Sequence, residues 1–94
     1  MTMVLVRHKV RDYAQWKPIF DEHGAARKKG GCLGGRVLRS VKDPNEVVVI
    51  TEWPDTSKAE AFAGDPGLKD AMMRAGVVDR PDIYFLEEVE VVPF

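Results

Sequence analysis

This chain has almost no cysteine: Cys32 is alone among 94 residues, so neither an internal disulfide nor a cysteine-based zinc site can form. We expect Cys32 to be a small apolar residue at the start of a strand, in a reducing cytosol. The sequence also lacks a run of the ~20 apolar residues that a membrane-spanning helix needs. Its first residues enter a strand directly, with no charged leader and no small-residue cleavage site. A soluble, cytoplasmic protein without a membrane partner is therefore expected.

The chain has little net charge, with 14 Lys and Arg against 15 Asp and Glu. This balance gives no long-range field that would attract nucleic acid or anionic lipid, so neither partner is expected. The glycine pairs at 30–31 and 34–35 lack the GxxxxGK and GxGxxG patterns of phosphate-binding loops. The two histidines, His8 and His23, should lie roughly 10 Å or more apart, too far to share a metal. No metal and no cofactor is expected.

Apolar strand sequence is what the chain has in plenty. Side chains of residues 3–10 alternate between two faces, and both faces begin apolar. The runs at 47–50 and 83–86 behave in the same way, which is typical of strands buried on two sides. A chain of this length buries only roughly 60 to 65% of the surface that its unfolded form exposes. A second layer from another subunit would cover the remaining face.

Caps and breakers divide the chain into elements. Asp12 with Gln15 has the spacing of a capping box, as has Ser57 with Glu60, while Pro18 predicts a kink or an irregular first turn. The expected elements are a strand at 3–10, a helix at 12–29, strands at 33–41 and 46–53 joined by a turn at 42–45, helices at 57–64 and 65–76, and a strand at 82–90.

The order β-α-β-β-α-β predicts an α+β, ferredoxin-like fold: a four-stranded antiparallel sheet with its helices on one face. Residues 1–94 should form a single domain. The other face would carry Leu5, Val48 and Ile50 or their neighbours, a patch that monomers seldom expose. We therefore expect a homodimer that forms through its sheets.

Several segments together carry a resemblance to a known family: His8-Lys9-Val10, Asp12-Tyr13 through Trp16 to Phe20-Asp21-Glu22-His23, Asp43-Pro44-Asn45-Glu46 with Glu52-Trp53, Ala61-Phe62, Pro66-Gly67-Leu68-Lys69-Asp70-Ala71-Met72, Ala75-Gly76-Val77 and Tyr84-Phe85-Leu86. Through them nearly the whole chain resembles the dimeric α/β-barrel superfamily, and within it small proteins of the antibiotic biosynthesis monooxygenase (ABM) type. The resemblance implies two sheets closed face to face, with a pocket between sheet and helices in each subunit. Members include cofactor-free oxygenases of aromatic polyketides, haem-degrading enzymes, isomerases and proteins of unassigned role, so the resemblance specifies fold better than chemistry.

The haem-degrading branch of this superfamily uses an Asn on the first strand and a Trp and a His in the second helical region. The matching positions in this chain are Val6 or His8, about Phe62, and about Met72. None of them carries the required residue, so haem degradation is not expected.

An aromatic stripe on the first helix is the candidate binding surface. Tyr13, Trp16, Phe20 and His23 follow at steps of three, four and three, so they share the face toward the sheet. Such a stripe is typical of core packing, and it equally fits the flat apolar wall of a small-molecule pocket. His23 could instead serve at the surface edge or in helix packing.

His8 is the candidate catalytic residue, because it shares a strand face with Val4 and would point toward the helices. Two interpretations stay open: a hydrogen-bonded core histidine, or a group that orients the substrate or transfers a proton. Phe62 and Met72 are further candidates for substrate contact, Met72 having gap filling as its alternative role. Trp53 should lie at the pole opposite His8 and pack under the strand-to-helix corner.

Two functions from different classes fit these residues. One is a cofactor-free oxygenase or isomerase acting on an aromatic or quinone-like molecule, for which proximity and a deprotonated substrate suffice. The other is a non-catalytic dimer that binds a small hydrophobic ligand or serves in stress response. Removing a general base lowers the turnover of the first by ~10-fold or more and lowers only the affinity of the second. We favour a ligand-binding protein with monooxygenase activity.

Overall fold

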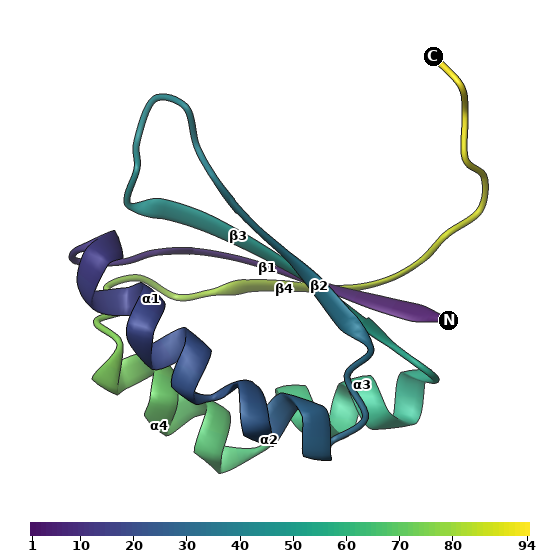
Figure 1. Ribbon diagram of the computed structural model, residues 1–94, viewed down its shortest axis with the longest axis horizontal. Coiled ribbons are helices and arrows are strands. Elements are labelled where there is room, and N and C mark those ends of the chain that lie inside the picture. Colours follow the sequence, from purple (N-terminus) through teal and green to yellow (C-terminus); the bar gives the residue numbers. More distant parts are fainter.

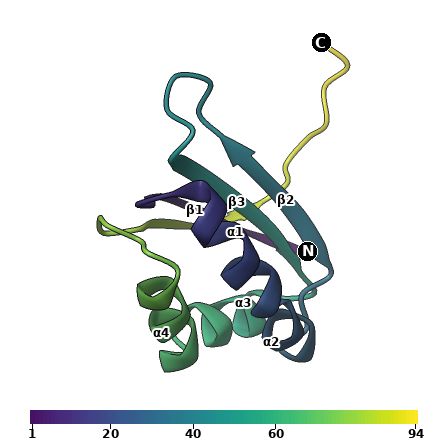
Figure 2. The same cartoon turned by 60° about the vertical axis from the view of Figure 1, so that its left-hand side comes forward.

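The computed structural model describes residues 1–94 and consists of one sheet with helices on one side. The strands lie in the order β2-β3-β1-β4, all pairs antiparallel. Figures 1 and 2 show the four helices against one face of this sheet. The predicted α+β, ferredoxin-like fold is confirmed. In chain order the elements are β1 (Thr2–Lys9), α1 (Tyr13–Glu22), α2 (Gly24–Lys29), β2 (Gly34–Arg39), β3 (Glu46–Trp53), α3 (Thr56–Ala63), α4 (Pro66–Arg74) and β4 (Asp82–Glu87).

The buried core lies between the sheet and the helices. Strand pairing sets Val6 opposite Val49 and His8 opposite Val47, which places one row of each strand toward the helices. Val47 and Val49 pack in one cluster with Trp16. A separate cluster lies toward the other end of the same strands and consists of Val4, Trp53 and Ala59. The core is thus divided into two halves. None of the helices is long and apolar enough to cross a membrane.

The opposite face of the sheet is also apolar, and no helix covers it (Figure 1). Leu5 lies between Ile50 on β3 and Tyr84 on β4, while Leu38 on β2 pairs with Val48. Tyr84 is 55% exposed and Leu38 is 47% exposed. The two-sided apolar pattern of the sequence is therefore present in the sheet, with its helices on one side only.

The β2–β3 hairpin turn holds the start of α1. Asp43 shapes the turn: its side chain accepts a hydrogen bond from the Asn45 N–H (2.9 Å), and its carbonyl accepts one from Glu46 (3.0 Å). The side chain of Asn45 accepts a hydrogen bond from the Tyr13 N–H (3.0 Å), and its carbonyl accepts one from the Val10 N–H (2.8 Å). Because the first N–H groups of a helix need outside acceptors, the turn fixes where the aromatic helix begins.

The prediction of one long first helix is wrong in its middle. Asp12 caps the helix as expected, accepting a hydrogen bond from the Ala14 N–H (3.0 Å), and Pro18 lies inside α1 without ending it. The break comes at His23, whose carbonyl accepts two N–H groups of α2 (3.1 and 3.2 Å). Gly24 follows it, and glycine is a poor helix former because of its backbone freedom. The chain changes course there, at the last residue of the aromatic stripe.

Two strands are shorter than expected. The strand expected at 33–41 is Gly34–Arg39, because the Ser40 hydroxyl accepts the next two free N–H groups (3.2 and 3.3 Å) and starts the turn. The strand expected to reach residue 90 ends at Glu87, since its partner Thr2 is the first residue of β1. Residues 88–94 leave the sheet and extend away from the fold (Figure 1).

The caps of the two later helices were predicted with mixed success. Asp65 caps α4 as expected, accepting a hydrogen bond from the Gly67 N–H (2.8 Å). The cap of α3 is Asp55 rather than Ser57, and its carboxylate accepts a hydrogen bond from the Lys58 N–H (2.8 Å). A carboxylate at this position binds backbone N–H groups more strongly than a hydroxyl, which explains the earlier start.

Gly35 allows β2 and β3 to approach closely, and this leads to a first prediction. A Cβ atom at Gly35 would overlap the carbonyl oxygen of Ile50 and lie 3.0 Å from Cα of Thr51. Because both are backbone atoms, Gly35→Ala should lower the free energy of unfolding by about 1 to 3 kcal/mol, the usual cost of overpacking. Gly64→Ala is the control, since its Cβ would lie 3.4 Å from the nearest backbone oxygen. Urea titrations in which the two variants are equally stable would contradict this account.

Candidate functional site

A cavity lies between the sheet and the helices. It is lined by 17 residues, of which 13 are hydrophobic, and every element except β2 contributes to it. The cavity volume is about 70 Å³, and the hollow takes up about 660 Å³ when its open mouth is included. The cavity is thus smaller than the roughly 300–1,000 Å³ of drug-sized ligand pockets, and a two-ring ligand would also occupy the mouth.

His8 lies at one end of this cavity. It is 3% exposed, and neither Nδ1 nor Nε2 has a hydrogen-bond partner. The ring of Trp16 meets it edge to face, with centroids 5.8 Å apart. Burial lowers the pKa of His8 below its ordinary 6.5, an effect that the charge of Asp79 opposes and that of Arg7 reinforces. His8 is therefore a neutral imidazole at neutral pH. No protein group makes the hydrogen bond of the core histidine considered from the sequence.

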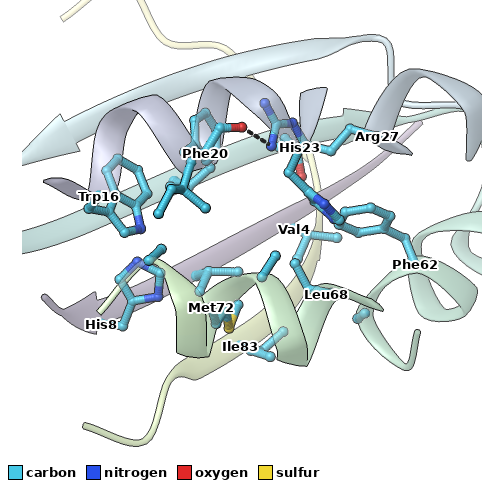
Figure 3. A pocket seen from close by; sticks show the side chains of 17 residues that line it. Val4, His8, Trp16, Phe20, His23, Arg27, Phe62, Leu68, Met72 and Ile83 are labelled. Atoms are coloured by element: carbon cyan, nitrogen blue, oxygen red, sulfur yellow. Dashed lines mark hydrogen bonds between the residues drawn. The ribbon is translucent and has the colours of Figure 1, made fainter. Parts of the chain in front are cut away.

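His23 and Arg27 form a second polar end, which Figure 3 shows across the cavity from His8. Nε2 of His23 is buried without a hydrogen-bond partner. Burial lowers the pKa of His23, and the positive charges of Arg27 and Arg74 lower it further. The guanidinium of Arg27 lies 3.8 Å above the Phe20 ring and donates a hydrogen bond from Nη1 to the Phe20 carbonyl (2.9 Å).

Apolar side chains fill the distance between the two polar ends. Phe20 stacks on Trp16 with centroids 4.8 Å apart and ring planes 22° apart. These two stacked rings are the aromatic part of the lining on α1. The side chains on the other sides include Val4, Leu68, Met72 and Ile83 (Figure 3). Such a cavity can hold an apolar ring by contact with these side chains, with hydrogen bonds only at its two ends.

The cavity brings together most of the candidate residues from the sequence. The lining includes His8, Trp16, Phe20, His23, Phe62 and Met72. Tyr13 is the exception: its ring lies beside Trp16 (5.7 Å) and beneath the guanidinium of Arg39 on β2 (4.4 Å). The hydrogen bond from the Tyr13 N–H to Asn45 holds the first turn of α1 over the hairpin. Tyr13 therefore packs against Trp16 and does not line the cavity.

Trp53 occupies the predicted corner, outside the cavity lining. It is fully buried (0% exposed), with its ring 4.9 Å from that of Phe62 and its Nε1 donating a hydrogen bond to the Thr51 hydroxyl (2.8 Å). Sequence reasoning missed Arg27. The signal was present, because Arg27 follows His23 by four residues and continues the stripe at helical spacing. Leu68 carries no comparable signal, since its place in the lining depends on how α4 packs.

The cavity can accept a proton or a hydrogen bond at the His8 end. At the end formed by His23 and Arg27 it can bind an electron-rich or anionic group. No group of three His, Cys, Asp or Glu side chains is placed to hold a metal ion. Cys32 is free, with its Sγ 3.5 Å from the carbonyl oxygen of Gly34.

Comparisons with known proteins agree with this fold. Residues 7–74 match the family model described as antibiotic biosynthesis monooxygenase. No curated protein sequence matches the chain. Among solved structures, SnoaB, a cofactor-independent oxygenase from Streptomyces nogalater, has a TM-score of 0.80 at 18% identity, with 99% of this chain and 97% of SnoaB covered.

Two further similar structures come from other bacteria. A protein from Bordetella bronchiseptica has a TM-score of 0.81 at 13% identity, covering 95% of this chain and 97% of that one. A protein from Caulobacter crescentus has a TM-score of 0.75 at 22% identity, covering 95% and 90%. At these identities the similarity to solved structures demonstrates the shared fold.

Proposed function

Since the chain belongs to the antibiotic biosynthesis monooxygenase family, we propose that it is a cofactor-independent monooxygenase acting on a small phenolic or quinone-forming aromatic molecule. The observation that carries this proposal is the buried, unpaired imidazole of His8 within the cavity. Leaving a buried polar group without a partner costs free energy, and a ligand hydroxyl would supply the missing hydrogen bond. The shared fold with SnoaB, a cofactor-independent oxygenase, supports the same class of reaction.

In the proposed reaction the substrate itself supplies the electrons. His8 accepts the proton of a phenolic hydroxyl, and the resulting phenolate is a far better electron donor to dioxygen than the neutral phenol. One oxygen atom becomes the second carbonyl oxygen, at a ring carbon that loses its hydrogen. That hydrogen and the phenolic hydrogen leave with the second oxygen atom as water. The substrate thus loses the four electrons that dioxygen gains. Trp16 and Phe20 would hold the ring beside His8 and keep water away from it.

The expected homodimer is part of this proposal. The uncovered face carries Leu5, Leu38, Ile50 and Tyr84. Its charged groups include Arg36 beside Ile50, Glu52 beside Met3, and Arg7 with its acidic partners. Arg7 is paired with three carboxylates of its own chain at 2.8 to 3.4 Å, those of Glu46, Asp79 and Asp82. The charges around Arg7 are therefore neutralised locally, and the apolar side chains of this face remain free to pack against a second copy.

Titration with 1-naphthol tests binding and turnover together. We expect binding with micromolar to millimolar affinity in the absence of oxygen, measured by tryptophan fluorescence. Under air, we expect one dioxygen to be consumed for each 1,4-naphthoquinone formed. Binding without any oxygen consumption would contradict the monooxygenase and favour a ligand-binding protein.

The two tryptophans provide the internal control for where the ligand sits. Trp16 lines the cavity, whereas Trp53 is packed behind it. Trp16→Phe should therefore lose most of the ligand-dependent change in fluorescence, and Trp53→Phe should keep it. The reverse result would place the ligand at the Phe62 end and remove His8 from the reaction.

A further inference from the structure

Arg27 has no acidic partner in this chain. It makes one hydrogen bond, from Nη1 to the Phe20 carbonyl, so most of the five N–H donors of its guanidinium have no protein acceptor. The side chain is nevertheless half-buried, and burial lowers its pKa. The cations that do form ion pairs within 4.0 Å are Arg7, Lys9, Lys17 and Arg74. A partly desolvated guanidinium that lines a cavity without a carboxylate is suited to receive one from a ligand.

His23 adds a second unpaired group at the same end of the cavity. Its Nε2 is buried and has no partner, and its ring lies against that of Phe62 with centroids 5.8 Å apart (Figure 3). The charge of Arg27 is near enough to lower the pKa of His23. The acidic groups in this neighbourhood are already engaged: Asp65 caps α4, and Asp21 is paired with Lys17 at 2.6 Å. The charges of Asp21 and Asp65 still raise the pKa of Arg27 and of His23, respectively, but neither carboxylate forms an ion pair with these residues. The positive charge of this end is thus only partly compensated from within the protein.

The hydrogen bond between Arg27 and Phe20 fixes the guanidinium in place. The Phe20 carbonyl belongs to the last turn of α1, where carbonyl groups lose their helical partners and need other donors. Nη1 of Arg27 satisfies it at 2.9 Å, and stacking at 3.8 Å over the Phe20 ring orients the guanidinium plane. This structural role uses one N–H donor of the Arg27 guanidinium and fixes the position of the remaining N–H donors.

We propose that Arg27 and His23 bind a carboxylate, and that the cavity prefers an aromatic hydroxy acid to a neutral phenol. This inference rests on the proposed small-molecule function of the cavity and narrows its substrate class. The hydroxyl would meet His8, the rings would lie along Phe20 and Trp16, and the carboxylate would meet Arg27. A planar carboxylate accepts two parallel N–H bonds from a guanidinium, and one arginine in a mostly apolar lining matches a single negative charge.

A matched pair of ligands tests the carboxylate directly: 2-naphthol and 6-hydroxy-2-naphthoic acid, which carries its carboxyl group at the far end of the same ring system. Anaerobic fluorescence titrations measure both dissociation constants without turnover. We expect the dissociation constant of the wild-type protein for the acid to be at least ~10-fold lower than that for 2-naphthol. Arg27→Met should reduce this preference to within about twofold, while Arg27→Lys, which keeps the charge, should retain part of it.

Arg80→Met is the matched control, because it removes the same charge from an exposed residue outside the cavity lining. It should leave the preference for the acid unchanged, and circular dichroism should give the same spectrum for all variants. Equal affinities of the wild type for the two ligands would overturn the proposal, as would a preference that survives Arg27→Met or disappears equally in Arg80→Met. His8→Gln should keep the preference. A protein that prefers the acid but consumes no oxygen would refute the monooxygenase and leave the carboxylate site standing.

Discussion

Replacing Ile50 by aspartate should dissociate or unfold the protein, which we expect to sediment at micromolar concentration as twice its 10.5 kDa chain. Ile50 lies at the centre of the uncovered sheet face, with Leu5 opposite it on β1 and Arg36 opposite it on β2. A dimer formed through this face should bury at least ~1,200 Å², the lower range of specific interfaces. An unpaired carboxylate inside it would cost several kcal/mol, because a buried charge loses its hydration. Val48→Asp should act in the same way.

Val41→Asp is the control for the dimer, since this hairpin side chain is fully exposed (104%) and introduces the same charge. Its sedimentation and its urea midpoint should match those of the wild type. A stable wild-type monomer would remove the explanation for strands that are apolar on both faces. A dimer that persists unchanged in Ile50→Asp would mean that the interface lies elsewhere.

The fold could be predicted from the sequence because its signals are local. Alternation in the strands, the turn residues Asp43 and Asn45, and the cap at Asp65 each act over a few residues, and each element they predict is present. The errors fall where distant contacts decide. The last strand ends at Glu87 because its partner on β1 begins at Thr2, and no pattern near residue 87 encodes that register.

The site was only partly predictable for a related reason. Helical spacing brought Trp16, Phe20 and His23 to one face, and these three line the cavity. The same spacing included Tyr13, which the hairpin instead holds over β2. It could also have included Arg27. A charged side chain is normally expected to be exposed to solvent, however, and only the tertiary structure shows that Arg27 lines the cavity. The unpaired state of His8 is likewise invisible in a sequence, because it depends on every group that surrounds the ring.

His8→Gln should lower oxygen-dependent turnover by about 10²- to 10⁴-fold, the usual contribution of a general base, and should change ligand affinity much less. Glutamine keeps a polar side chain of similar size but cannot accept a proton. Oxygen consumption with 1-naphthol measures the loss. His23→Gln is the matched control, because it removes the other histidine of the cavity and should leave most of the turnover in place. A His8→Gln variant that turns over at the wild-type rate would exclude His8 as the base.

The pH dependence of the same variants separates proton transfer from simple packing. Burial lowers the pKa of His8 below 6.5, opposed by Asp79 and reinforced by Arg7, so the neutral base should persist into mildly acidic solution. Values of kcat/KM should therefore fall only as the pH drops below 6.5, and His8→Gln should lack this acid limb while His23→Gln retains it.

The free energy of unfolding should also decrease as the pH falls below 6.5. The unfolded chain takes up the proton near 6.5, before the folded chain does, so the free energy of unfolding is constant above that pH and decreases as the pH falls toward the lower folded value. His23 has a lowered pKa as well, so His8→Gln should reduce this slope without abolishing it. An acid limb that persists unchanged in His8→Gln would assign the titration to another group and remove His8 from the proton transfer.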